Sequence, residues 1–126
     1  MRLLDSNVVI YATDSGHAWL ADWIDSEEFR TSIITKIEVL GYHKLTDDQA
    51  ERLKQFFQAA LIIPMDSKIV EIAISLRCRE RMSLGDAIIA ATALHYNFQL
   101  VTRNVKDFDW IDGLNVINPF DFKPHD

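Results

Sequence analysis

Cysteine is nearly absent from this sequence, and its scarcity excludes two kinds of site. Cys78 is the only cysteine, so no disulfide can form within the chain and no thiolate cluster is available for structural zinc. A free cysteine usually behaves as a small hydrophobic residue, so we expect Cys78 to lie in the core. Disulfide-free chains suit reducing compartments, and we predict a cytoplasmic protein.

Long apolar runs and linkers are missing as well. No segment approaches the ~18 apolar residues of a membrane-spanning helix, so we expect no membrane anchor. The first residues, Met1 to Asp5, reach a charge too early to form the apolar part of a signal peptide. No repeat, low-complexity tract or Gly/Ser/Pro-rich linker interrupts the 126 residues. We therefore predict a single domain over residues 1–126, a length ordinary for one domain.

Positive charge is also in short supply. Thirteen Lys and Arg stand against nineteen Asp and Glu, which leaves a formal net charge of −6. Proteins that bind nucleic acids usually carry a basic surface, so this balance counts at first against such a partner. The hydrophobic content of 48% is that of an ordinary globular domain. The meaning of the acidity therefore depends on where the acidic residues lie.

Short apolar runs alternate with helical patterns along the chain. The strand candidates are residues 3–5, 29–34, 61–65, 100–102 and 114–117. Helical patterns follow Asp5 or Ser6, cover residues 17–24, and begin at Thr35, after Thr46, after Asp66 or Ser67, and after Ser83. Thr46 and Gln49 have the spacing of a capping box. The apolar run 61–65 is predicted to be a buried strand, and Ala87–Ala91 a central helix. This alternation predicts an α/β fold with a mainly parallel sheet of four to five strands and helices on both faces.

Three acidic residues stand among apolar or small neighbours. Asp5 follows Leu3-Leu4, Glu38 lies between Ile37 and Val39, and Asp86 lies between Gly85 and Ala87. A buried carboxylate is costly unless it is hydrogen-bonded, paired or bound to a metal. Each residue also has a simpler explanation: Asp5 as a helix cap, Glu38 as a water-facing side chain, and Asp86 as a partner of the positive end of its helix.

Taken together, the three acids point to a metal site. In parallel sheets functional groups collect beyond the carboxyl ends of the strands, where Asp5 and the loop after Thr102 fall. Carboxylates gathered there repel one another and need a cation to remain ionised. Mg²⁺ and Mn²⁺ prefer oxygen ligands and assist phosphoryl displacement. The sequence therefore predicts metal-assisted hydrolysis of phosphodiesters.

Four segments resemble the PIN domain, and most closely the VapC-type toxin ribonucleases of type II toxin–antitoxin systems. They are Leu4–Tyr11, Ile37–Gly41, Leu84–Ala93 and Leu100–Phe108, which occur in the family's order. The resemblance implies a Rossmann-like sheet and an endoribonuclease that depends on Mg²⁺, with Mn²⁺ as a substitute. It also implies an RNA substrate, a homodimer, and inhibition by a small antitoxin protein.

Carried over residue by residue, the resemblance makes Asp5, Glu38 and Asp86 the catalytic acids. Asp5 and Asp86 are then expected as direct metal ligands, and Glu38 as a ligand bound directly or through water. The fourth position stays open, because Asn104 stands where many relatives have aspartate and Asp107 is an acid in the same loop. Ser6 and Thr102 are candidates either to orient carboxylates or to cap turns.

Five basic residues are candidates for contacts with RNA, and two alternative functions also have to be considered. Arg77, Arg79, Arg81, Arg103 and Lys106 can contact RNA phosphates or can simply form a solvated surface. A haloacid-dehalogenase-like phosphatase would need Asp-x-Asp after the first strand, where this chain has Asn7. A non-catalytic RNA-binding or interaction module of the same fold is the other alternative, although all three acids are present. If those acids share a pocket, part of the net negative charge of the chain lies in that pocket.

Overall fold

A computed structural model describes residues 1–124, in which short strands alternate with longer helices. The strands are β1 (Arg2–Leu4), β2 (Phe29–Ser32), β3 (Ile62–Ile63), β4 (Gln99–Val101) and β5 (Val116–Ile117). The α-helices are α1 (Ser6–Thr13), α2 (Ala18–Asp25), α3 (Ile33–Leu40), α4 (Asp47–Ala59), α5 (Ser67–Arg79) and α6 (Leu84–Tyr96). Three short 3-10 helices are η1 (Ser15–His17), η2 (Val105–Asp107) and η3 (Pro119–Phe122).

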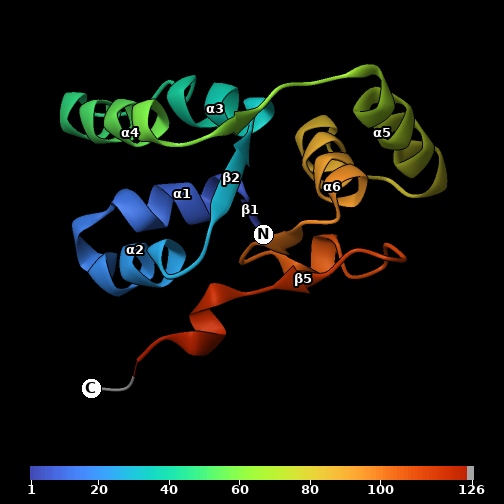
Figure 1. Cartoon of the computed structure of the whole chain (residues 1–126). Helices are drawn as coiled ribbons and strands as arrows, with labels where there is room; N and C mark the ends of the chain where they lie inside the picture. Colours follow the sequence, from blue (N-terminus) through green and yellow to red (C-terminus); the bar gives the residue numbers. More distant parts are fainter. Residues whose placement is uncertain (125–126) are drawn as a thin grey trace.

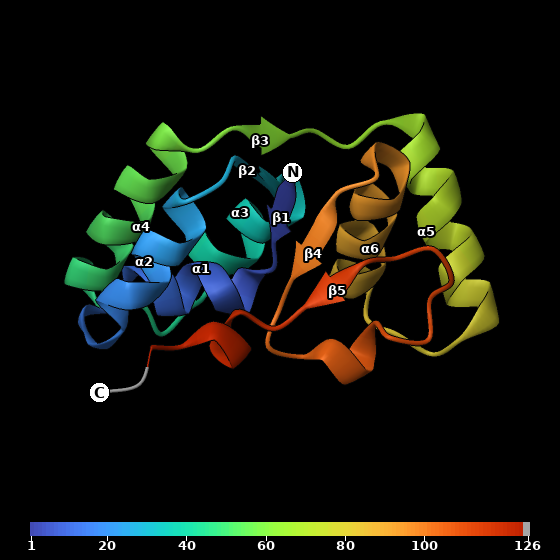
Figure 2. The same cartoon turned by 60° about the horizontal axis from the view of Figure 1, so that its bottom comes forward.

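The five strands form one sheet in the order β3-β2-β1-β4-β5, and every neighbouring pair is parallel (Figure 2). The central strand β1 pairs Leu4 with Thr31 on one side and with Val101 on the other. Helices α1 to α4 lie on one side of the sheet, and α5 and α6 lie on the other (Figure 1). The predicted α/β fold with a parallel sheet covered on both faces is confirmed.

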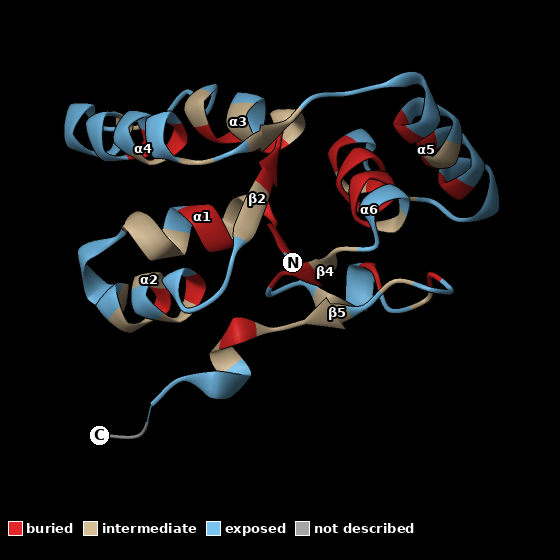
Figure 3. Cartoon of the chain, in the orientation of Figure 1, coloured by how far each residue is buried: buried red, intermediate tan, exposed pale blue. Residues whose placement is uncertain are grey.

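The core is divided by the sheet into two layers, because successive side chains of a strand point to opposite faces. Leu3 and Leu100 face the layer formed with α5 and α6. Leu4 and Val101 face the layer formed with α1 to α4. Helix α6 is buried from Ala87 to Ala93, so its predicted central position is confirmed (Figure 3).

Helix caps agree with the sequence in most places. Thr46 and Gln49 form the predicted capping box at the start of α4. The Asp66 carboxylate accepts a hydrogen bond from the Ile69 backbone N–H at the start of α5, and the Ser83 hydroxyl accepts one from the Asp86 backbone N–H at the start of α6. These caps satisfy backbone donors that the first turn of a helix leaves unpaired.

Three local predictions are wrong. The second strand ends at Ser32 rather than at residue 34, because the Ser32 hydroxyl accepts a hydrogen bond from the Ile34 N–H and starts α3. The run 61–65 is not a buried strand: β3 is a half-buried edge strand, and Leu61 is 60% exposed. Cys78 is exposed, since the buried stripe of α5 runs through Ala73 and Leu76 and leaves Cys78 on the outer side.

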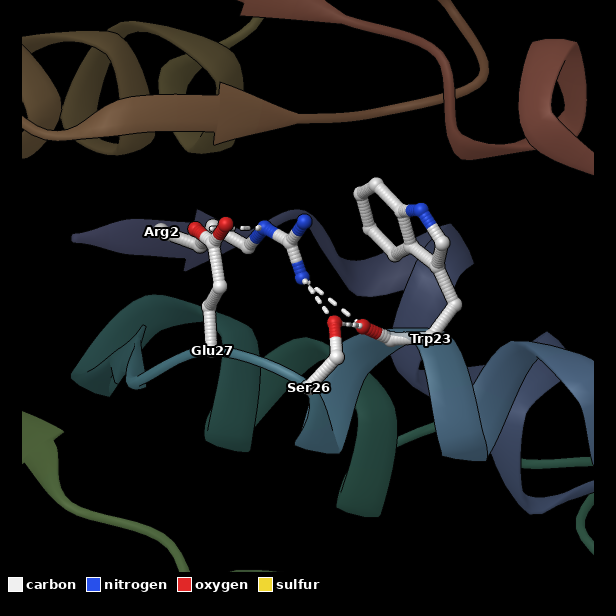
Figure 4. A network of polar contacts seen from close by, with 4 residues as sticks. All are labelled: Arg2, Trp23, Ser26 and Glu27. Carbon is white, nitrogen blue, oxygen red and sulfur yellow. Dashed lines mark hydrogen bonds and ion pairs between the residues drawn. The ribbon is translucent and has the colours of Figure 1, made fainter.

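A buried arginine fixes the amino-terminal end of the central strand. Arg2 is 7% exposed, and its guanidinium lies 3.7 Å from the centroid of the Trp23 ring (Figure 4). Its Nη1 donates to the Trp23 carbonyl at 2.8 Å, and its Nε lies 3.6 Å from a carboxylate oxygen of Glu27. These contacts join β1 to the end of α2 and leave the carboxyl edge of the sheet free for other groups.

Among residues 1–124, no helix has the length and apolar character needed to cross a membrane.

Candidate active site at the carboxyl edge of the sheet

Asp5 lies directly after the central strand and forms the N-cap of α1. Its Oδ1 accepts a hydrogen bond of 2.8 Å from the Ser6 backbone N–H. Its Oδ2 accepts one of 2.8 Å from the Thr102 hydroxyl, and the Asn7 amide lies 3.4 Å away. Thr102 follows β4, the neighbour of β1, so parallel pairing brings both residues to the same edge. Asp5 therefore caps a helix and is also held by a second strand end.

Burial raises the pKa of Asp5 from its ordinary value of 3.8 to about 6. Hydrogen bonds from Thr102 and Ser6 act in the opposite direction, because they stabilise the carboxylate. The negative charges of Asp86 and Glu38 raise the pKa further. Asp5 is only 5% exposed, so little water screens these effects.

Glu38 reaches this edge from α3, on the same side of the sheet as α1. The Ser6 hydroxyl donates to Oε1 of Glu38 at 2.9 Å, while the Ser6 backbone N–H donates to Asp5. Ser6 thus links the two carboxylates. The Glu38 carboxylate also lies against the Cα of Gly85, at the start of α6. Glu38 itself is exposed, which agrees with the alternative explanation of a water-facing side chain.

Asp86 and Asp107 lie on the α6 side of the site. Burial raises the pKa of Asp86, and the nearby charges of Asp107 and then Glu38 raise it further, whereas the hydrogen bond with Ser83 lowers it. Asp107 belongs to η2, in the loop after β4. The structure therefore places Asp5, Glu38, Asp86 and Asp107 close enough for their charges to interact.

Asn104 stands apart from this set. Its backbone N–H donates to the Thr102 hydroxyl at 3.0 Å, and its carbonyl accepts from the Asp107 N–H at 3.0 Å. Within residues 1–124 its side chain makes no hydrogen bond to the site carboxylates. Asn104 shapes the loop through its backbone, while Asp107 brings a charge to Asp86.

A cleft of about 690 Å³ opens beside Asp86 and Asp107. It is lined by acidic, basic, uncharged polar and apolar side chains: Arg77, Glu80, Arg81, Met82, Ser83, Asp86, Lys106, Asp107 and Trp110. Three of the five basic residues singled out from the sequence are thus at the cleft. Trp110 also lines it, although no motif in the sequence singled it out.

The other two basic residues pack against aromatic rings. The Arg103 guanidinium lies 3.9 Å from the Phe120 centroid and 4.8 Å from that of Tyr11. Arg79 lies 5.7 Å from the Trp110 centroid. Arg103 therefore has a structural partner that the sequence pattern did not indicate.

The donors at this edge suit a hard divalent cation. They are carboxylate oxygens, and burial raises the pKa values of Asp5 and Asp86, which the neighbouring carboxylates raise further. The side chains as they stand are not drawn together on one point: in the described residues 1–124, no three Asp, Glu, His or Cys side chains form a group that could hold an ion. The chemistry of these oxygen donors fits a metal ion. The hydrogen bond from the Ser6 hydroxyl holds the Glu38 carboxylate beside Ser6.

A doubly covered parallel sheet with acidic residues beyond its central strands defines this chain as an α/β protein with a candidate acidic active site. The chain belongs to the PIN domain family, whose model matches residues 2–114. It is 29% identical to the plasmid stability protein StbB of Pseudomonas syringae pv. tomato, over 96% of this chain and 99% of that protein. It is 27% identical to a ribonuclease VapC of Rickettsia bellii, over 93% and 96% of the two chains.

A solved structure gives the same result. A toxin–antitoxin complex from Klebsiella pneumoniae contains a chain that matches with a TM-score of 0.78 and 32% sequence identity. The match covers 94% of this chain and 98% of that one. The resemblance inferred from the four sequence segments is confirmed.

Proposed function

We propose that this chain is a metal-dependent endoribonuclease that hydrolyses RNA phosphodiester bonds, using Mg²⁺ or, in its place, Mn²⁺. The observation that carries the proposal is the gathering of four carboxylates at one edge of the sheet: Ser6 hydrogen-bonds both Asp5 and Glu38, and Asp86 and Asp107 line one cleft beside them. Such a cluster is costly for a merely structural surface and useful for binding a cation. The similarity to a protein named ribonuclease VapC supports the same activity.

Asp5 and Asp86 would hold the metal directly, with Glu38 binding directly or through water. For the fourth position the geometry favours Asp107 over Asn104, because the charge of Asp107 acts on Asp86 and the Asn104 side chain does not contact the acids. A bound divalent cation supplies charge that stabilises the phosphoryl oxygens and makes water more acidic.

The remaining residues position these acids and the substrate. Thr102 holds the carboxylate of Asp5, and Ser6 holds those of Asp5 and Glu38. Arg77, Arg81 and Lys106 flank Asp86 and Asp107 in the cleft, where they can contact RNA phosphates. RNA would then meet a few cations beside a metal-filled acidic pocket, which reconciles an RNA substrate with the net charge of −6.

The biological role we propose is that of the toxin in a type II toxin–antitoxin pair, acting in the cytoplasm as a homodimer and as a single PIN domain. The match to a chain of a toxin–antitoxin complex supports an antitoxin partner. A phosphatase of the haloacid dehalogenase type is disfavoured, because the position two residues after Asp5 holds Asn7, whose amide points to Asp5 instead of supplying a second acid.

Incubation of the purified chain with RNA tests the activity. We expect cleavage with Mg²⁺ or Mn²⁺, none in EDTA, and recovery when the metal is restored. Cleavage that persists in EDTA would contradict the proposal. Induced expression should arrest growth, and co-expression of the adjacent open reading frame should relieve it; a harmless protein would contradict the toxin role while leaving the nuclease intact.

A further inference from the structure

Gly85 occupies an unexpected position at the start of the most buried helix. It is the second residue of α6 and is itself buried. Glycine is among the weakest helix formers, because it has the most backbone freedom to lose. Its backbone conformation gives no reason for glycine: among residues 1–124 the only glycine with positive φ is Gly113. The reason must lie in the space beside it.

That space is taken by one side chain. A Cβ built on Gly85 would lie 3.0 Å from Cδ and 3.2 Å from Oε1 of Glu38, and closer still to Oε2. All three of the nearest atoms belong to the Glu38 carboxylate, the far end of a flexible and exposed side chain. A methyl group at position 85 would therefore displace this carboxylate and leave the backbone of α6 where it is.

The displaced group is one that the site uses. The Glu38 carboxylate accepts a hydrogen bond from Ser6 on one side and rests on Gly85 on the other. From this place its charge acts on both Asp5 and Asp86. Helices α3 and α6 pack together, so the Glu38 carboxylate lies against the first turn of α6.

We propose that Gly85 is a positioning residue for Glu38: the missing side chain leaves the room in which the Glu38 carboxylate sits beside Asp5 and Asp86. The inference rests on the proposed function, because it matters for RNA cleavage only if Glu38 serves the metal site. It explains why a weak helix former stands in the first turn of a helix that is otherwise rich in alanine and isoleucine. Helix stability is given up here for the position of a carboxylate.

Gly85→Ala separates this role from a purely structural one. We expect the melting temperature in EDTA to stay equal to the wild-type value or to rise, since alanine is the better helix former. Cleavage with Mg²⁺ should fall by roughly 10- to 100-fold, the usual cost of losing a group that orients a metal ligand. Gly16→Ala is the matched control, because nothing lies within 4 Å of a Cβ at Gly16. A lower melting temperature with unchanged cleavage by Gly85→Ala would overturn the proposal.

A double-mutant cycle with Glu38→Ala tests whether Gly85 acts through Glu38. Calorimetric titration with Mn²⁺ should show weaker binding for Gly85→Ala than for wild type, and no further weakening when the substitution is added to Glu38→Ala. An equal loss in both backgrounds would overturn the proposal.

Crystal structures of wild type and Gly85→Ala provide a readout that does not depend on activity. We expect the hydrogen bond between Ser6 Oγ and Glu38 Oε1 to be broken in the variant, and its retention would overturn the positioning role. If wild type neither binds Mn²⁺ nor cleaves RNA, the proposed function fails. The two crystal structures would still show whether Gly85 determines the position of the Glu38 carboxylate.

Discussion

The Thr102 hydroxyl donates a hydrogen bond of 2.8 Å to Oδ2 of Asp5 across the boundary between two neighbouring strands. Both residues are buried, and both follow the last residue of their strand. The contact opposes the rise in the pKa of Asp5 that burial causes. One threonine thus keeps a buried carboxylate closer to the ionised form that a metal ligand requires.

Thr102→Val should raise the pKa of Asp5, because the side chain keeps its shape and loses its donor. We expect the acidic limb of the pH–rate profile with Mg²⁺ to move to higher pH, and cleavage at pH 7 to fall by roughly 10- to 100-fold. Thr102→Ser retains the hydroxyl and should keep the wild-type profile. Identical acidic limbs for wild type and Thr102→Val would show that the hydroxyl does not tune Asp5.

Asp5→Asn should abolish cleavage and stabilise the metal-free protein at neutral pH. A folded-state pKa of about 6, above the ordinary 3.8, means that the fold binds this proton more tightly than the unfolded chain does. The stability that protonated Asp5 contributes is therefore fully present below about pH 4 and is lost as the pH rises through 6. The free energy of unfolding falls by up to about 3 kcal/mol over this range. Asparagine carries no such cost, although it fits the hydrogen-bond donors less well.

Urea denaturation in EDTA at pH 4 and pH 7.5 measures this effect. The free energy of unfolding of Asp5→Asn should exceed that of wild type at pH 7.5, and the advantage should shrink at pH 4. Glu71→Gln, on the exposed side of α5, removes one charge elsewhere and serves as the control. A destabilised Asp5→Asn at both pH values would mean that the helix cap outweighs the buried charge.

Metal binding should release protons near pH 6 and not near pH 8. Asp5 is about half protonated at a pH equal to its pKa of about 6, and a divalent cation binds only the carboxylate. Titration of Mg²⁺ in two buffers with different ionisation enthalpies should reveal about half a proton released from Asp5 per ion at pH 6. Equal apparent enthalpies in both buffers at pH 6 would contradict this expectation.

Asp107→Asn and Asn104→Ala distinguish the two candidates for the fourth position. Removal of the Asp107 charge should lower the pKa of Asp86 and reduce cleavage by about tenfold or more, because a charge beside the proposed metal site is lost. Asn104→Ala should remain within a few-fold of wild type, since Asn104 contributes to the loop through its backbone groups. The reverse order of kcat/KM values would assign the position to Asn104.

The sequence was informative where local patterns and fold agree. The apolar run before Asp5 and the one before Thr102 predict two parallel strand ends, and the structure brings their side chains into hydrogen-bond contact. The capping box at Thr46 needs only residues within one helical turn, so it could be predicted without the fold.

The errors arise where tertiary contacts override local preference. Ile33 and Ile34 are β-branched and favour a strand, yet the Ser32 cap and the packing of α3 against α1 and α6 make them helical. The apolar run around β3 gives no sign that it lies at the sheet edge. The contact between Glu38 and Gly85 joins two helices distant in sequence, and no spacing rule predicts it.

Lys106→Ala and Arg81→Ala should weaken RNA binding without disabling the acids. Both side chains line the cleft beside Asp86, so we expect KM to rise severalfold while kcat changes little. The dependence of binding on salt concentration should also become less steep, because fewer phosphate contacts release fewer counterions. Lys54→Ala on the exposed surface of α4 is the charge-matched control. An unchanged KM and salt dependence for both cleft variants would place the RNA path elsewhere, whereas a fall in kcat alone would assign these cations to the reaction rather than to binding.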